Sequence, residues 1–369
     1  MKSNLASLEI HSLVEELQFL VGGRVDNIYN PQKEELILQL HKTGKGKQLL
    51  RIISGKLFYL ASKKAPSEAP SQFCMFLRKH LGNYRLKSVR QLESERIVEF
   101  LLEKDEKKKL IVEFFGKGNI LLCDKDDMIL SALVYHKWKD REIKPKLKYS
   151  YPTMKYNFLN LKLSELKDIL KESKNNLGKC LAAELGLGGS YSDEICLLSD
   201  IDKKTLPLKL EEKDTDNIFK SINKIINNQI NPAVFYKDNE VKDIVPIELK
   251  IYGGLEKKDF KSYSDAFDYY FISEFKEEKP KTKQEKELER INRMLSQQEQ
   301  TIKKLKVKEL DERAKADLVY QNYELIKDIL AELRKATKKY NWDEIKDKLK
   351  GHKTIKSLNS KEKTVEIEL

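Results

Sequence analysis

Cysteine is scarce in this 369-residue sequence, and the cysteines present are not arranged for metal binding or cross-linking. The four of them (Cys74, Cys123, Cys180 and Cys196) form no C-x-x-C pair, which argues against a zinc site or a disulfide framework. Three lie within apolar runs such as Ile120-Leu121-Leu122-Cys123, so we expect buried free thiols.

Long apolar runs are also missing. No stretch approaches the roughly 18 consecutive apolar residues that a membrane-spanning helix requires. No apolar segment follows Met1-Lys2-Ser3-Asn4, where a secretory signal would have one. We therefore expect a cytoplasmic protein without a membrane partner.

Catalytic and cofactor motifs are absent as well. The five histidines (His11, His41, His80, His136 and His352) show no ligand spacing to one another or to the cysteines. The sequence contains no Walker-type loop, no G-x-S-x-G and no H-E-x-x-H, and Gly116-Lys117-Gly118 is too short to cradle a phosphate alone. These absences predict a protein that is not an enzyme and that uses no cofactor or metal.

Positive charge is plentiful, with 71 Lys and Arg against 59 Asp and Glu and a formal net charge of +12. This excess favours a polyanionic partner, either nucleic acid or an anionic membrane surface, although lysine is common throughout the chain. The length predicts two or three domains. The charged fraction of 35% indicates a large exposed area such as an extended helical arm.

The N-terminal part combines two helices with many short strands. Apolar residues recur at helical spacing over residues 7–21, where Ser7 can cap the start and Gly22-Gly23 can end the helix. A second helix is expected over residues 71–81. About nine short strands, separated by glycine and proline turns, surround these helices and predict a β-sandwich or barrel.

Residues 136–156 are rich in basic residues interleaved with aromatic ones. The basic residues are Lys137, Lys139, Arg141, Lys144, Lys146, Lys148 and Lys155, and the aromatic residues are Trp138, Tyr149, Tyr151 and Tyr156. Pro145 and Pro152 argue against regular structure. We interpret the segment as a linker that also serves as a binding surface.

A glycine-rich turn at residues 186–189 follows a helix expected over 177–185 and opens onto a helix starting at Ser192 or Asp193. Backbone N–H groups at such a helix start can hold a phosphate, as in helix–hairpin–helix motifs. An ordinary tight turn between core helices explains the pattern equally well.

From residue 284 onward the chain shows heptad spacing. Leu288, Ile291, Leu295, Ile302 and Leu305 fit one seam, with Gln298 at a core position. After an expected break near Asp311 the spacing restarts at Val319. Two helices of a coiled-coil arm are predicted, with a strand-like segment over residues 364–369.

Several segments carry a resemblance to a known family. They are residues 20–29 (LVGGRVDNIY), 73–81 (FCMFLRKHL), 118–122 (GNILL) and 181–189 (LAAELGLGG), with the first helix before them and the heptads from residue 285 to about 338 after them. Their order along nearly the whole chain resembles the NFACT family of ribosome quality-control proteins, which includes eukaryotic NEMF and bacterial RqcH.

The resemblance implies an α+β fold. It implies a MutM/Fpg-like β-sandwich with flanking helices at residues 1–155, a helix–hairpin–helix domain at 156–230, and a hairpin and helix at 231–280 that return to the first domain. An antiparallel coiled-coil arm at 281–340 and the start of a truncated middle segment at 341–369 would follow, without the family's usual C-terminal domain.

The resemblance also implies a function without bond chemistry. The chain would bind tRNA on a large ribosomal subunit that carries a stalled nascent chain, contacting its rRNA and proteins, and would support mRNA-independent C-terminal tailing. Peptidyl transfer would belong to the ribosome, and the coiled coil would recruit a protein partner. The candidate RNA-binding residues are Glu9, Arg24, Arg78, Lys79, Glu95, Arg96, Lys117, Lys137, Lys139, Arg141, Gly186, Gly188 and Gly189.

Two positions depart from the family pattern. Glu9 stands where the early helix of the family commonly carries Asp, and Glu95-Arg96 stands where it carries an Asp-Arg pair important for tailing. Arg96 can still fork onto a phosphate or stack on a base, with either glutamate orienting it. From the pattern alone, Glu95-Arg96 is a turn before a strand.

Three other functions compete with this hypothesis. A DNA glycosylase would need an N-terminal proline amine, but Lys2 and Ser3 stand there, and no cysteine quartet forms a zinc finger. An adhesin would need an export signal. A coiled-coil scaffold would bind protein with little salt dependence, whereas RNA binding weakens steeply as salt rises.

Overall fold

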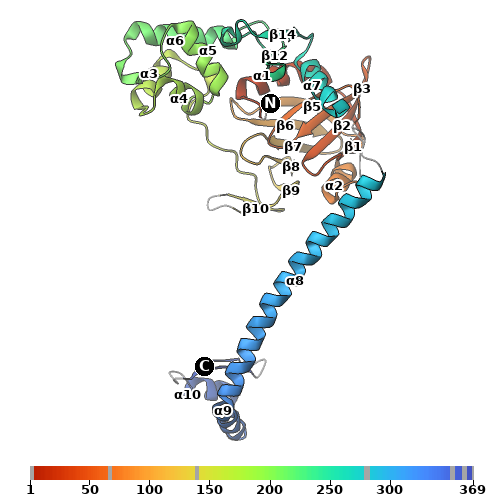
Figure 1. Ribbon diagram of the computed structural model, residues 1–369, viewed down its shortest axis with the longest axis vertical. Coiled ribbons are helices and arrows are strands. Elements are labelled where there is room, and N and C mark those ends of the chain that lie inside the picture. The colour runs from red at the N-terminus through yellow and green to blue at the C-terminus, as the bar shows by residue number, and fades with distance from the viewer. Residues whose placement is uncertain are drawn as a thin grey trace. The chain divides into compact units, whose positions relative to one another are not determined.

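The computed structural model describes residues 4–64, 69–137, 141–277, 283–349, 354–359 and 364–367 (Figure 1). The chain divides into two compact units, Met1–Glu277 and Glu278–Leu369. Across the described residues, no helix combines the length and the apolar composition needed to cross a membrane.

The first helix, α1 (Ser7–Glu16), forms as its spacing predicts and continues into a 3-10 turn, Leu17–Leu20. Ile10, Leu13 and Leu17 are fully buried on its inner face. The expected cap at Ser7 is wrong, because Ala6 is the N-cap and its N–H donates to the Glu9 carboxylate at 2.8 Å. Gly22, which adopts φ +86°, follows the turn as predicted.

Nine antiparallel strands form one sheet in the order β4-β3-β2-β1-β5-β6-β7-β8-β9. The strands are β1 (Arg24–Tyr29), β2 (Glu35–Lys42), β3 (Gly46–Ile53), β4 (Leu57–Ala61), β5 (Arg85–Gln91), β6 (Ile97–Glu103), β7 (Lys107–Glu113), β8 (Asn119–Asp124) and β9 (Ile129–Ala132). Helix α2 (Gln72–Leu81) connects β4 to β5, and the Ser71 hydroxyl caps it by accepting the Cys74 N–H at 3.2 Å. The sheet and its helices confirm the α+β class.

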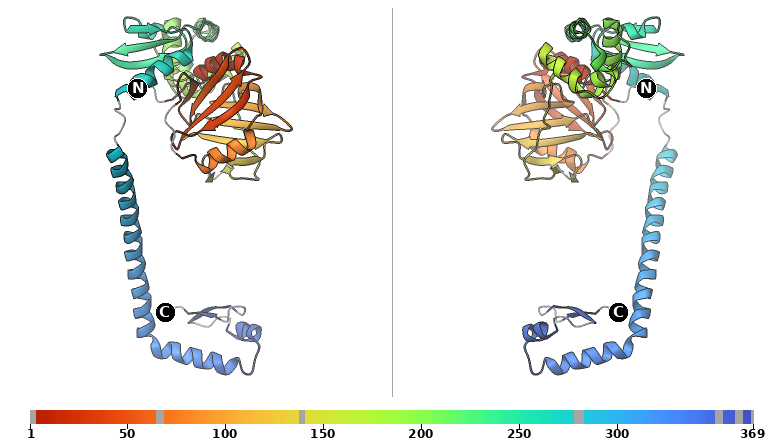
Figure 2. Two further views of the ribbon diagram at one scale, coloured as in Figure 1. Left: turned by 90° about the vertical axis from the view of Figure 1, so that its right-hand side faces the viewer. Right: turned by 90° about the vertical axis from the view of Figure 1, so that its left-hand side faces the viewer.

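The two halves of the sheet face each other across one core (Figure 2). Phe58 on β4 and Phe114 after β7 pack with ring centroids 5.1 Å apart. The Gly55 and Gly118 turns touch, since a Cβ on Gly118 would lie 1.9 Å from the Gly55 nitrogen. This close approach requires glycine and closes one end of the sheet as a sandwich would.

The outer face of β6 to β9 is covered by the chain that follows β9. Short strands β10 (His136–Lys137) and β11 (Glu142–Ile143) pair, and Ile143 and Tyr149 are buried against the sheet. Residues 141–151, which we call the strap, therefore contribute a small second core. The sequence predicted a linker that also serves as a binding surface, and it did not predict this packing.

A further core joins helices to a three-stranded sheet. The helices are α3 (Leu163–Glu172), α4 (Leu177–Lys179) with a π-helical turn Cys180–Glu184, α5 (Gly189–Ser199) and α6 (Glu212–Ile226). The sheet has the order β13-β12-β14, with β12 (Ala233–Lys237), β13 (Glu240–Val245) and β14 (Glu256–Asp259). Helix α7 (Tyr263–Glu277) follows and packs against β4 and the first core. The expected start of α5 at Ser192 or Asp193 is wrong, because the helix begins at Gly189.

The second unit holds α8 (Lys283–Gln321), α9 (Tyr323–Ala336), α10 (Trp342–Lys348), β15 (Ile355–Asn359) and β16 (Thr364–Ile367). The helix break lies at Asn322, so the predicted break near Asp311 is wrong. Ile329 and Leu333 of α9 pack with Ile345 and Ile355. The seam residues Ile291, Leu295, Ile302 and Leu305 of α8 are more than half exposed. An antiparallel pairing of α8 with α9 is therefore not seen among the described residues.

Candidate nucleic-acid interface

The turn between β5 and β6 is fastened to the start of α1. The Ser7 hydroxyl donates to the Ser94 carbonyl. The Gln91 amide donates to the Ser7 carbonyl at 3.1 Å and to the Glu95 carbonyl at 2.9 Å. These bonds hold Glu95 and Arg96 beside α1 in space, although Ser94 follows Ser7 by 87 positions in the sequence.

The glycine turn meets the same end of α1. Gly188, the N-cap of α5, adopts φ +87°, and a Cβ placed on it would lie 3.4 Å from the Ala6 Cβ. The Tyr191 hydroxyl on α5 donates to Glu9 Oε1 at 3.0 Å. The N-terminus of α5, which carries positive partial charge, therefore opens next to the start of α1.

Two further turns of the sheet lie at this end. The Leu5 N–H donates to the Lys56 carbonyl at 3.0 Å, and the Phe114 N–H donates to the Arg96 carbonyl at 2.8 Å. Because Gly55 and Gly118 are in contact, Lys56 and Lys117 project from neighbouring turns. Both lysines are exposed, and Arg96 is partly exposed.

We call this surface the sheet-end site and define it as Lys56, Glu95, Arg96, Lys117 and the glycine turn at residues 186–189. Its three cations outnumber its one carboxylate. Burial raises the pKa of Glu95, and the Arg96 backbone N–H and charge oppose that rise. Exposed cations on turns, next to a helix N-terminus, suit contact with phosphate groups, and the planar guanidinium of Arg96 suits bidentate contact.

Six of the predicted RNA-binding residues lie at the sheet-end site, and Lys56 was not among the predictions. Glu95, Arg96, Lys117 and the three glycines come together as one surface, although separate segments supply them. Lys56 was missed because one lysine after a glycine turn carries no signal by itself. The contact between the Gly55 and Gly118 turns and the hydrogen bond from the Leu5 N–H to the Lys56 carbonyl place it there.

Glu9 does not face a ligand in this structure. The residue is 2% exposed, and its carboxylate accepts from the Ala6 N–H and from Tyr191. The structure corrects its expected role: Glu9 joins α1 to α5 and so positions the glycine turn. Its partner Tyr191 lies 182 residues away along the chain.

Arg141 is partly buried, with its side chain 22% exposed, and is paired within the protein. Its guanidinium forms an ion pair with Glu113, whose side chain is 4% exposed, and lies 5.1 Å from the centroid of the Tyr149 ring. Arg141 thus anchors the strap, which corrects its prediction as an RNA contact. Lys137 is exposed on β10, and Lys139 lies outside the described residues.

The remaining predicted residues are carried by β1 and α2. Arg24 opens β1 opposite Arg85, and Lys79 is exposed on α2. Arg78 donates to the Ile28 carbonyl at 2.6 Å and lies 5.7 Å from the centroid of the Tyr29 ring. The structure therefore does not join Arg24, Arg78 and Lys79 to the sheet-end site.

Comparison with known proteins gives a consistent family match. The family model for NFACT N-terminal and middle domains matches residues 7–367. The archaeal Rqc2 homolog aRqcH of Methanocaldococcus jannaschii is 37% identical over 374 residues, covering 96% of this chain and 55% of that protein. The human ribosome quality control complex subunit NEMF is 26% identical over 380 residues, covering 94% of this chain and 35% of that protein. The chain thus spans about half or less of the length of these relatives.

Two solved structures share the fold. The fibrinogen binding protein from Staphylococcus aureus superposes with a TM-score of 0.62 at 20% identity, covering 72% of this chain and 98% of that chain. The N-terminal part of the fibronectin/fibrinogen-binding protein from Streptococcus suis gives a TM-score of 0.59 at 23% identity, covering 73% and 100%. At such identities the likeness shows a common fold only, and a common fold does not identify a common ligand.

Proposed function

The chain belongs to the NFACT family, and we propose that it acts in ribosome-associated quality control by binding RNA at the sheet-end site. Its relatives are named as subunits of the ribosome quality control complex or as Rqc2 and RqcH homologs. The RNA is a tRNA on a large ribosomal subunit that still carries a stalled nascent chain. The partners are then that tRNA and the rRNA and proteins of the subunit, in the cytoplasm.

One observation supports RNA binding most directly. Lys56, Arg96 and Lys117 come from three separate turns and lie at one end of the sheet, where the glycine turn opens α5. Because short turns project from the sheet, neighbouring strands do not cover the cations on them. These cations can therefore reach the phosphates of a folded RNA. Phosphate contacts of this kind supply most of the affinity and fix the orientation of the RNA.

The proposed role in tailing is to position the tRNA. The ribosome would perform peptidyl transfer, and this chain would hold an acceptor tRNA in place without mRNA. Arg96 is the residue best suited to the contact, because its guanidinium can bind a phosphate in a bidentate manner or stack on a base. Glu95 would orient that guanidinium.

Purification of the full chain from cells, followed by sequencing of bound RNA, tests the proposal. We expect large-subunit rRNA together with a narrow set of tRNAs. Arg96→Gln should weaken tRNA binding about 10-fold or more, as expected for removal of a charged contact worth about 1–3 kcal/mol. Lys45→Gln, in the exposed turn between β2 and β3, is the charge-matched control.

Two results would contradict the proposal. Recovery of RNA with no enrichment of tRNA or rRNA would exclude the quality-control role. Incision of a duplex with an abasic site, above a heat-killed control, would favour the DNA-repair alternative instead.

A further inference from the structure

The outer face of β5, β6 and β7 carries a second set of cations. In the antiparallel ladder Arg90 lies opposite Glu99, Leu101 opposite Lys109, and Glu103 opposite Lys107. The alternate residues of these strands, such as Val89, Phe100 and Leu110, point into the first core. Polar and charged side chains are therefore collected on the outer face by the period of the strands.

These side chains line a groove of about 270 Å³ next to the strap. The lining residues are Ser88, Arg90, Glu99, Leu101, Lys107, Lys109 and Lys125. Four of the seven are cationic and one is a carboxylate. The groove is separate from the sheet-end site, since none of its lining residues belongs to that site.

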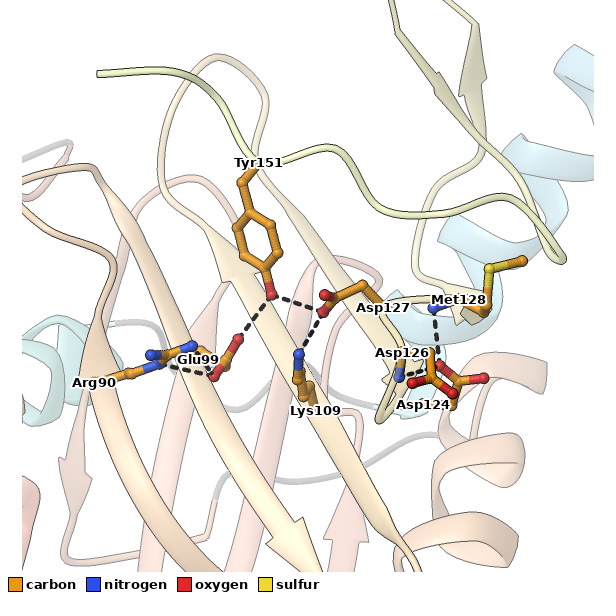
Figure 3. Close-up of polar contacts among 8 residues, drawn as sticks. All are labelled: Arg90, Glu99, Lys109, Asp124, Asp126, Asp127, Met128 and Tyr151. Atoms are coloured by element: carbon orange, nitrogen blue, oxygen red, sulfur yellow. Dashed lines mark hydrogen bonds and ion pairs between the residues drawn. The ribbon is translucent and has the colours of Figure 1, made fainter. Parts of the chain in front are cut away.

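Glu99 and the neighbouring Asp127 are joined by hydrogen bonds through Tyr151 (Figure 3). Glu99 Oε1 accepts from Arg90 at 2.8 Å, and Glu99 Oε2 lies 2.8 Å from the Tyr151 hydroxyl. The same hydroxyl lies 3.0 Å from Asp127 Oδ1, which also accepts from the Lys109 ammonium at 2.6 Å. Burial and the two carboxylates raise the pKa of Tyr151, so its hydroxyl stays protonated as the shared donor.

Three of the four cations, in contrast, are presented to solvent, whereas Lys109 is 17% exposed and paired with Asp127. The side chain of Glu99 is 4% exposed, whereas that of Arg90 is 58% exposed and that of Lys125 is 71% exposed. Lys107 is exposed as well. An anion at the mouth of the groove therefore lies closer to the exposed cations than to the buried Glu99 carboxylate. The negative charge of Glu99 is also compensated by its ion pair with Arg90.

Exposed carboxylates on the rim are paired with lysines. Asp126 lies 3.9 Å from Lys125, and Glu103 lies 2.9 Å from Lys87. Such exposed pairs contribute little and exchange readily, so a phosphate can replace the carboxylate as the partner of Lys125.

We propose that this groove binds the phosphodiester backbone of an RNA, as a contact in addition to the sheet-end site. That the polyanion is an RNA rests on the proposed function. The cations stand on both sides of an open groove, on β5 and on β7 with the turn after β8, which suits an extended chain of phosphates better than one small anion. Among the lining residues that the structure describes there is no aromatic ring, so these residues offer charge contacts to the backbone and no base stacking.

Lysine footprinting of the full chain with and without a transfer RNA transcript tests this inference. Acetylation rates are measured at Lys107 and Lys125 for the groove and at Lys56 and Lys117 for the sheet-end site. Lys45 and Lys47, exposed in the turn between β2 and β3, are the reference lysines. We expect RNA to protect both pairs and to leave the reference lysines unchanged.

The pattern of protected lysines distinguishes a failure of the groove proposal from a failure of the sheet-end site proposal. Protection of Lys107 and Lys125 alone supports the groove and overturns the sheet-end site. Protection of Lys56 and Lys117 alone overturns the groove and leaves the proposed function standing. Protection of neither pair, or equal protection of the reference lysines, overturns both.

A pair of variants gives an independent readout. Lys107→Gln with Lys125→Gln removes two exposed charges without touching the buried Glu99 carboxylate, so the fold should survive. The slope of log Kd against log salt for the transfer RNA should fall in magnitude by about 2, roughly one for each lysine that no longer neutralises a phosphate. Lys45→Gln with Lys47→Gln is the matched control. Equal slopes for the two double variants would overturn the groove.

Discussion

The hydrogen bond from the Tyr191 hydroxyl to Glu9 can be removed by Tyr191→Phe, which keeps the ring and deletes one oxygen. Tyr191 is 1% exposed, and its hydroxyl donates to Glu9 Oε1 at 3.0 Å. The other oxygen of Glu9 accepts the Ala6 N–H at the start of α1. The substitution therefore spares the cap of α1 and cuts the bond between α1 and α5.

The expected magnitude follows from the charge and burial of the acceptor. A hydrogen bond to a charged group contributes about 1.5–3 kcal/mol, against about 0.5–1.5 kcal/mol for a neutral pair. Glu9 is 2% exposed, so water does not replace the missing donor. We expect Tyr191→Phe to lower the free energy of unfolding by about 2 kcal/mol.

Tyr263→Phe is the matched control. Tyr263 is fully buried, and its hydroxyl donates to a neutral acceptor, the Ile244 carbonyl, at 2.9 Å. Its removal should cost about 1 kcal/mol. Both variants remove one hydroxyl from a buried ring, so their difference measures what the direct hydrogen bond to Glu9 adds beyond a bond to a neutral carbonyl.

Hydrogen exchange of the intact chain, read by mass spectrometry on peptides from α1 and α5, provides the assay. About 2 kcal/mol corresponds to roughly 30-fold faster exchange in Tyr191→Phe, against about fivefold in Tyr263→Phe. Equal acceleration in the two variants would refute the role of Glu9 as a charged partner. Unchanged tRNA affinity in Tyr191→Phe would show that RNA binding does not need the glycine turn held against α1.

Two more predictions concern the corrected and the retained site residues. Arg141→Ala should lower the free energy of unfolding by about 2–3 kcal/mol in urea titration, because the buried Glu113 carboxylate loses its cationic partner and keeps only a neutral donor, the Tyr149 hydroxyl, among the bonds of the described residues. The affinity for tRNA should stay within about twofold, and a large drop in affinity with full stability would restore Arg141 as an RNA contact. Glu95→Gln should stabilise the chain at neutral pH. Burial raises the pKa of Glu95 above its ordinary value of 4.5, so the ionised form is disfavoured on folding and stability falls as pH rises through that window. The advantage of Glu95→Gln should vanish below pH 4.5, and an advantage that persists in acid would contradict this cause.

Local patterns predicted elements well where one face is buried. The spacing of Ile10, Leu13 and Leu17 predicted α1, because residues three or four apart share a helix face. Ser71 and Gly82 marked the limits of α2 in the same way. Helix starts were predicted less well, since the N-cap of α1 is Ala6, whose N–H donates to Glu9, and the N-cap of α5 is Gly188.

The exposure of charged residues could not be read from the pattern. Glu9 and Arg141 both suited an RNA contact by charge, yet Glu9 is buried and Arg141 is partly buried, and each is paired within the protein. Their partners, Tyr191 and Glu113, are 182 and 28 residues away. Burial of a charge is decided by whether a partner reaches it in the fold, and spacing along the chain does not report that.

The sequence by itself determined the α+β class, the basic character of the chain and its membership of the family, because composition, strand and helix periods and ordered motifs are local properties. The tertiary structure decided which cations act together. Curling of the nine-stranded sheet brings Lys56 beside Lys117 and Arg96. It also turns Arg90 and Lys107 to one outer face. Phosphate recognition depends on such proximity, because the attraction between charges falls with distance and salt largely screens it beyond about 10 Å.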